Sequence, residues 1–116
     1  MFRYVTRFAL ITALAHLVLE LSVSFLPVIY PILITELGLT YSQVGTIALV
    51  AILGGSLTQP LFGYLSDRIG PSRLVILSLV WSGLLMGTVG LIDSYGSLLL
   101  LVGLAVLGSA AFHPAG

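Results

Sequence analysis

The 116-residue chain has no cysteine and no lysine, and only 7% of its residues are charged. Without cysteine, disulfides, thiol catalysis and cysteine metal sites are excluded. The net charge is zero and no basic run occurs, so nucleic acid is not an expected partner. No nucleophile–base set, phosphate loop or metal-ligand spacing is present. We therefore expect neither an enzyme nor a bound cofactor or metal.

Apolar residues take the place of the missing charges. They make up 59% of the chain, against roughly 45–50% apolar and 25% charged residues in soluble domains. Four apolar runs predict transmembrane helices over about residues 8–34, 41–65, 73–92 and 97–116. The composition therefore predicts an all-α integral membrane protein embedded in a lipid bilayer. The fourth run reaches Gly116 without a polar flank, so we expect a truncation within helix 4.

Short polar segments separate the runs. Gly38 is a suitable helix end, and Thr40 with Gln43 three residues later predicts a capping box. Residues 66–73 predict a tight polar loop, with Pro71 in the first turn of the next helix. Helix entry and exit are thus encoded locally at both connections.

The arginines indicate the orientation. Arg3 and Arg7 lie at the amino end, Arg68 and Arg73 lie in the second connection, and the other connections have none. The positive-inside rule then places the amino terminus and the second connection in the cytoplasm. A cleavable signal peptide ending at Ala15 is the alternative for the amino end, but the apolar run before it is short.

His16 and Glu20 are ionisable groups inside the first span. They are four residues apart and share one helical face. A charge at that depth costs roughly 2.5–3.5 kcal/mol on insertion scales. Glu20 is therefore expected to be neutral, paired or beside a water-filled cavity, which makes it a candidate proton carrier. The alternative is that the pair only holds the helices together.

Two further polar positions accompany this pair. Tyr30 lies between Pro27 and Pro31 on the first span, and His113 precedes Pro114 on the fourth. Proline removes a helical hydrogen bond and bends the helix, which allows it to line a cavity. We expect Tyr30 and His113 to contribute to proton coupling or to a substrate cavity.

Pairs of small residues predict where helices approach one another, because lipid offers no hydrophobic drive between spans. The pairs are Ala51 with Gly55, Gly83 with Gly87, and Ala105 with Ser109.

The second connection contains the most specific motif, Gly63, Asp67, Arg68 and Gly70 in the spacing Gly-x-x-x-Asp-Arg-x-Gly. It resembles the signature between helices two and three of the major facilitator superfamily (MFS). The resemblance implies that Asp67 latches a cytoplasmic gate by facing a helix amino terminus in the other half of the transporter. Two basic residues usually follow the last glycine, and here only Arg73 stands nearby.

Within that superfamily the chain is most similar to the fosmidomycin-resistance permeases. The likeness rests on His16 and Glu20, the stretch Leu26-Pro27-Val28-Ile29-Tyr30-Pro31, Glu36, Leu39-Thr40, Gln43-Val44-Gly45, Gln59-Pro60, Gly63-Tyr64, Asp67-Arg68, Gly108-Ser109 and Phe112-His113-Pro114. It implies four helices of an N-terminal six-helix bundle in a twelve-helix inner-membrane antiporter. That protein would export a small molecule or drug against inward proton flow, with helices one and four lining the cavity and helix three outside.

Two other functions stay open at this stage. A small four-helix multidrug transporter acting as a dimer would fit the length and the acid in the first span. A non-transporting membrane subunit would fit the composition, but it gives no reason for ionisable residues in the first and fourth spans.

The orientation can be tested because the chain has no native cysteine. In whole cells, single Ser72→Cys and Ser94→Cys variants should differ in their labelling by an impermeant thiol reagent. We expect labelling at position 94, on the outer side, and none at position 72. Labelling at position 72 but not at 94 would invert the topology.

Overall fold

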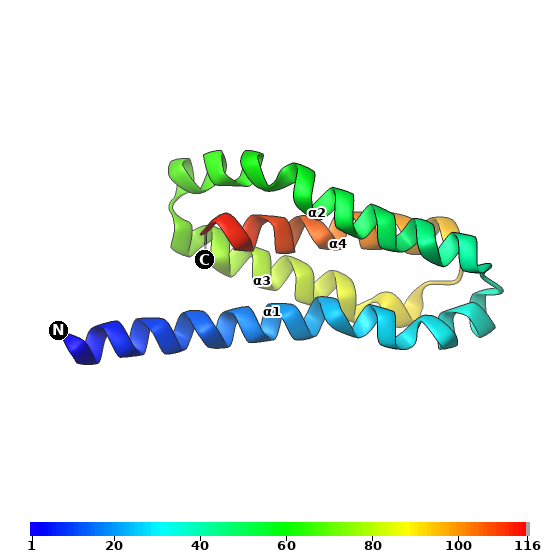
Figure 1. The fold of residues 1–116 in the computed structure, drawn as a ribbon, viewed down its shortest axis with the longest axis horizontal. Helices are drawn as coiled ribbons and strands as arrows, with labels where there is room; N and C mark the ends of the chain where they lie inside the picture. Colours follow the sequence, from blue (N-terminus) through cyan, green and yellow to red (C-terminus); the bar gives the residue numbers. More distant parts are fainter. Residues whose placement is uncertain (116) are drawn as a thin grey trace.

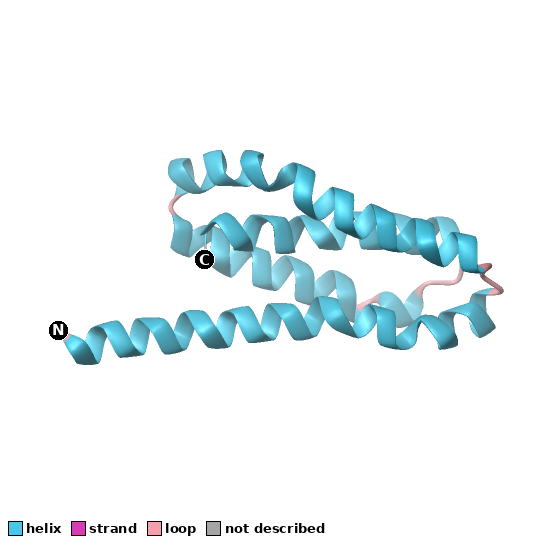
Figure 2. Ribbon diagram, in the orientation of Figure 1, coloured by secondary structure: helices cyan, strands magenta, loops and turns pink. Residues whose placement is uncertain are grey.

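A computed structural model describes residues 1–115 as four antiparallel helices joined by short turns (Figures 1 and 2). The helices are α1 (Phe2–Leu37), α2 (Tyr41–Ile69), α3 (Pro71–Gly87) and α4 (Tyr95–Ala115), with a short 3₁₀ helix η1 (Val89–Leu91) after α3. Four helical segments are long and apolar enough to cross a bilayer, and residues 1–115 contain no strand. The predicted all-α membrane fold is confirmed.

The helices do not stop where the apolar runs stop. α1 has 36 residues and α2 has 29, so at 1.5 Å per residue they are about 54 and 44 Å long, against a hydrocarbon core of ~30 Å. The prediction of a polar loop over residues 66–73 was wrong, because α2 continues to Ile69 and only Gly70 interrupts the helix. Hydropathy indicates where the lipid-embedded part of a helix ends, whereas the helix itself can continue into the aqueous phase.

The connections have the local geometry that the sequence predicts. Gly38 ends α1 in the left-handed conformation, with φ 64°. The Thr40 hydroxyl accepts from the Gln43 amide at 3.1 Å, and the Gln43 side chain accepts from the Thr40 amide at 2.9 Å. The capping box is therefore confirmed. Gly70 has φ 94°, which favours glycine, and Pro71 starts α3.

α4 is the central helix of the described bundle. It lies between α2 and α3 in Figure 1, and half of its apolar window is buried, against 28% or less for the other spans. α1 packs mainly through its carboxyl half, where Leu26 and Leu33 join the core, while most of its first 18 residues are exposed. The packed unit is thus α2, α3 and α4, with α1 attached along one part.

Glycines allow the close approach of α4 to its neighbours. A Cβ built on Gly54 of α2 would lie 3.1 Å from Val106, and one on Gly103 would lie 3.6 Å from Val50. A Cβ on Gly108 would overlap the Ser82 hydroxyl and lie 3.0 Å from the Ser78 carbonyl oxygen. These contacts supply the dispersion that replaces a hydrophobic drive in lipid.

Two side chains of α3 also bond to the backbone of α4. The Trp81 indole N–H donates to the Leu104 carbonyl at 2.7 Å, and the Ser82 hydroxyl donates to the Ala105 carbonyl at 3.3 Å. α3 therefore presents polar groups to α4, although it carries no charge beyond Arg73 near its start.

The predicted small-residue pairs agree with this packing only in part. Ala105 is 1% exposed, as expected for an interface residue, and Ala51 is partly buried against the core. Gly83, Gly87 and Gly55 have open space where a Cβ would stand, considering the described residues. Spacing alone does not say which face of a helix meets its neighbour.

The α3–α4 contact predicts an asymmetric response to alanine. Gly108→Ala should lower the stability of the folded bundle by roughly 1–3 kcal/mol, the usual cost of overpacking, because the Ser78 backbone has to move. Gly83→Ala is the matched control and should cause no loss. Thermal unfolding in detergent measures both variants. Equal midpoints would mean that α3 and α4 do not approach closely at Gly108.

Candidate functional site

Three ionisable side chains meet between α1 and α4. Glu20 Oε1 lies 3.7 Å from His16 Nε2 on its own helix, and 3.7 Å from His113 Nε2 on α4. The two imidazole ring centroids are 5.5 Å apart. One carboxylate oxygen thus lies within ion-pair distance of two imidazole nitrogens from different spans. We call these three residues the ionisable cluster.

The contacts within the ionisable cluster are adjustable. A separation of 3.7 Å exceeds the ~2.7–3.2 Å of a hydrogen bond, so each contact is Coulombic when the histidine is protonated. The side chains of His16, Glu20 and His113 are 49%, 45% and 37% exposed, which leaves room for movement. No group of three potential ligands in the described part of the chain could hold a metal ion.

Phe112 supports the cluster from α4. It is 1% exposed, and its ring centroid lies 5.5 Å from that of His16 and 6.1 Å from that of His113. A fully buried ring cannot move without repacking the core. Phe112 therefore limits where the two imidazoles can lie.

The ionisable cluster borders a cavity of about 300 Å³ between the four helices. Its polar lining consists of Glu20, Ser24, Tyr30, Ser109 and His113. The apolar lining is Val23, Leu26, Pro27, Ala51, Met86, Val102 and Val106. An apolar wall with a few convergent polar groups is the usual form of a small-molecule site.

The structure separates the predicted site residues by position. Glu20, Tyr30 and His113 line the cavity, whereas His16 does not. Ser24 and Ser109 also line the cavity, although neither was predicted from the sequence as a site residue. Each of these serines lies four residues from an ionisable group on its own helix, so i, i+4 spacing is the signal that could have found them.

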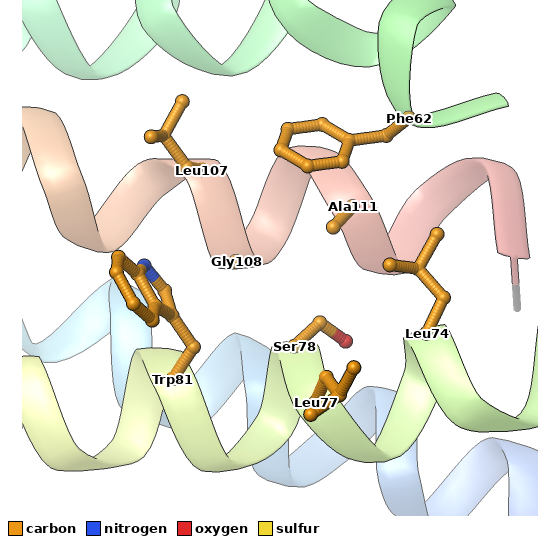
Figure 3. A pocket seen from close by; sticks show the side chains of 8 residues that line it. All are labelled: Phe62, Leu74, Leu77, Ser78, Trp81, Leu107, Gly108 and Ala111. Carbon is orange, nitrogen blue, oxygen red and sulfur yellow. The ribbon is translucent and has the colours of Figure 1, made fainter. Parts of the chain in front are cut away.

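A second pocket, of about 390 Å³, lies between α2, α3 and α4 (Figure 3). The residues that line it, labelled in Figure 3, are Phe62 of α2, Leu74, Leu77, Ser78 and Trp81 of α3, and Leu107, Gly108 and Ala111 of α4. None of the residues that line it is charged or titrates near neutral pH. It therefore offers no place for a proton carrier, and the cavity beside the ionisable cluster is the better candidate site.

The motif of the second connection lies apart from the cavity, at the α2–α3 joint. Asp67 and Arg68 are exposed in the last turn of α2, and Arg73 is exposed in the first turns of α3. The Arg68 guanidinium lies 5.0 Å from the Tyr64 ring centroid, a cation–π contact. Asp67 and Arg68 form no ion pair with each other within residues 1–115, and Asp67 remains accessible.

Gly63 connects this motif to α4. A Cβ built on Gly63 would lie 3.8 Å from the Pro114 Cβ, which is ordinary van der Waals contact. Pro114 follows His113 directly, so the end of α2 touches the segment that carries one member of the ionisable cluster.

Comparisons with known proteins extend over all of these residues. A family model described as Major Facilitator Superfamily matches residues 12–116. The Fosmidomycin resistance protein of Escherichia coli (strain K12) is 38% identical over 104 residues, 88% of this chain and 25% of that protein. The Uncharacterized MFS-type transporter YfnC of Bacillus subtilis (strain 168) is 30% identical over 109 residues, 92% of this chain and 26% of that protein.

The chain thus spans about a quarter of the length of these curated relatives. No solved structure shows significant similarity.

Proposed function

Because this chain belongs to the Major Facilitator Superfamily, we propose that the full-length protein is a proton-coupled permease that exports a small molecule or drug across the inner membrane. The superfamily consists of transporters and not of enzymes, so the expectation that the chain is not an enzyme is confirmed. The resemblance to fosmidomycin-resistance permeases, first drawn from the motifs, is confirmed as well.

The observation that carries the proposal is the Glu20 carboxylate between two imidazoles at the edge of a cavity. An acid at membrane depth is costly unless it is protonated or paired, and imidazole side chains exchange protons near neutral pH. The ionisable cluster can therefore take up and lose protons while it remains beside the site where a substrate would bind.

The cavity supports a small organic substrate. Tyr30 and the apolar wall offer contact area, and Ser24, Ser109 and His113 offer hydrogen bonds. The name of the Escherichia coli relative, Fosmidomycin resistance protein, supports a drug as the exported compound. In the full-length protein the remaining helices would complete the cavity from the other side.

The cytoplasmic gate is the second part of the proposal. In it, the amino terminus and the α2–α3 joint lie in the cytoplasm, as the arginine distribution predicts. Asp67 is exposed and able to face the amino terminus of a helix in the other half. Gly63 allows α2 to approach α4, and Gly70 allows the turn between α2 and α3. Arg68 and Arg73 are the basic residues of the proposed gate.

The matched relatives are about three and a half times as long as this chain, which supports a two-halved permease over a four-helix multidrug dimer. A non-transporting subunit would leave the ionisable cluster without a use.

The gate predicts that Asp67→Asn impairs export more than folding. An exposed substitution should change stability by no more than about 0.5 kcal/mol, whereas the proposed helix-end contact is worth about 0.3–1 kcal/mol, or up to ~2 when partly buried. Export by the full-length variant should be compared with that of Asp93→Asn, because Asp93 is an exposed acid in the connection between α3 and α4. Normal export at normal expression by Asp67→Asn would remove Asp67 from the gate.

Proton coupling predicts a selective loss in Glu20→Gln, which keeps the shape and removes the titrating group. In proteoliposomes, with radiolabelled fosmidomycin as the probe, the variant should bind and exchange substrate but fail to concentrate it under a pH gradient. Glu36→Gln, at the far end of α1, should behave like the parent. If Glu20→Gln still drives uphill transport, Glu20 is structural and the coupling group lies elsewhere.

A further inference from the structure

The structure assigns different tasks to the two histidines of the ionisable cluster. We propose that His16 relays the proton from Glu20 out of the cavity to the end of the bundle that carries the arginines, while His113 stays on the cavity side. This inference rests on the proposed function, because it supposes that Glu20 carries the coupled proton.

The order of the residues along α1 is the first support. The α1 residues that line the cavity run from Glu20 to Tyr30, which lies further from the amino terminus. The amino terminus, the described end of α4 and the α2–α3 joint lie at the same end of the bundle (Figure 1). His16 lies one turn nearer to that end than Glu20 and is not part of the cavity lining. It therefore stands between the edge of the cavity and the arginine-bearing end.

The contact itself is the second support. His16 Nε2 is 3.7 Å from Glu20 Oε1, so an approach of roughly 0.5–1 Å would form a hydrogen bond. About half of the His16 side chain is exposed within the described chain, which leaves the ring free to turn. An imidazole can accept a proton at one nitrogen and release another proton from the second nitrogen.

The proposed step is balanced in protons. Neutral His16 takes the proton of the Glu20 carboxylic acid at Nε2, which leaves a carboxylate and an imidazolium. The other ring nitrogen then gives its proton to water, and the ring returns to its starting tautomer by exchange with water. The carboxylate that remains is stabilised by His113, whose Nε2 lies 3.7 Å from the same oxygen.

Within residues 1–115, the ion pairs of Glu20 are those with His16 and His113. His113 is the alternative route, because the described end of α4 lies at the arginine-bearing end of the bundle, but His113 lines the cavity and His16 does not. Tyr30 lies deeper along the cavity, and on α1 the next charged side chains beyond His16 are Arg7 and Arg3, both exposed. Arginine stays protonated in proteins and cannot accept the proton. His16 is thus the titratable group on α1 between Glu20 and the arginines.

His16→Gln of the full-length protein tests the relay. In proteoliposomes with radiolabelled fosmidomycin as the probe, substrate exchange at equal pH on both sides should match the parent, which also shows that the variant folds. Uphill transport under a pH gradient should fall at least about a hundredfold, the lower end of the contribution of a proton-transfer group. Imidazole added on the arginine-bearing side should restore it with rising concentration, whereas sodium chloride of equal ionic strength should not.

The outcomes separate the relay from the proposed function. If His16→Gln concentrates the probe like the parent while Glu20→Gln fails, the relay is overturned and proton coupling at Glu20 stands. A loss in His16→Gln that imidazole does not restore also overturns the relay, because the ring is then only a structural neighbour. If Glu20→Gln itself behaves like the parent, the relay fails because Glu20 does not carry the coupled proton, and the coupling group of the proposed permease lies elsewhere.

Discussion

The Glu20 carboxylate needs a partner at membrane depth, and the arrangement of α1 against α4 provides two. An unpaired charge there would cost several kcal/mol, so the position of α1 is linked to that of His113 on α4. The distances of 3.7 Å to both imidazoles show a loose arrangement. A tight, fully bonded pair would fix the helices, whereas these longer contacts leave the three side chains room to move.

The ionisable cluster lies where α1 changes from buried to exposed within the described chain. α2, α3 and α4 approach closely at Gly54, Gly103 and Gly108, so this part has little room for movement. On α1, Leu26 and Leu33 join the core, while most of the first 18 residues are exposed. Glu20 lies at the boundary between these two parts of α1.

The motif of the α2–α3 joint and the ionisable cluster approach each other through α4. A Cβ built on Gly63 would lie 3.8 Å from the Pro114 Cβ, and Pro114 follows His113 in the chain. If Asp67 takes part in the proposed gate, a movement of α2 would reach the neighbourhood of the ionisable cluster at this point.

The sequence by itself determined the features that depend on solvent and on neighbours along the chain. The low charge and the apolar runs were enough to predict four membrane helices. The turns could be predicted from Gly38, Thr40 with Gln43, and Pro71, because these signals act within a few residues. The loop expected over residues 66–73 failed because hydropathy reports the edge of the lipid and not the end of a helix.

Tertiary structure decided what depends on the relative rotation of the helices. His16 and Glu20 could be paired by their spacing, but His113 follows Glu20 by 93 positions in the sequence, and only packing brings it to the same oxygen. Packing also placed His16 outside the cavity and chose Gly108 rather than Gly83 and Gly87 for a close approach. In lipid every face of such a helix is apolar, so periodicity does not reveal which face turns inward, and van der Waals fit between the spans makes that choice.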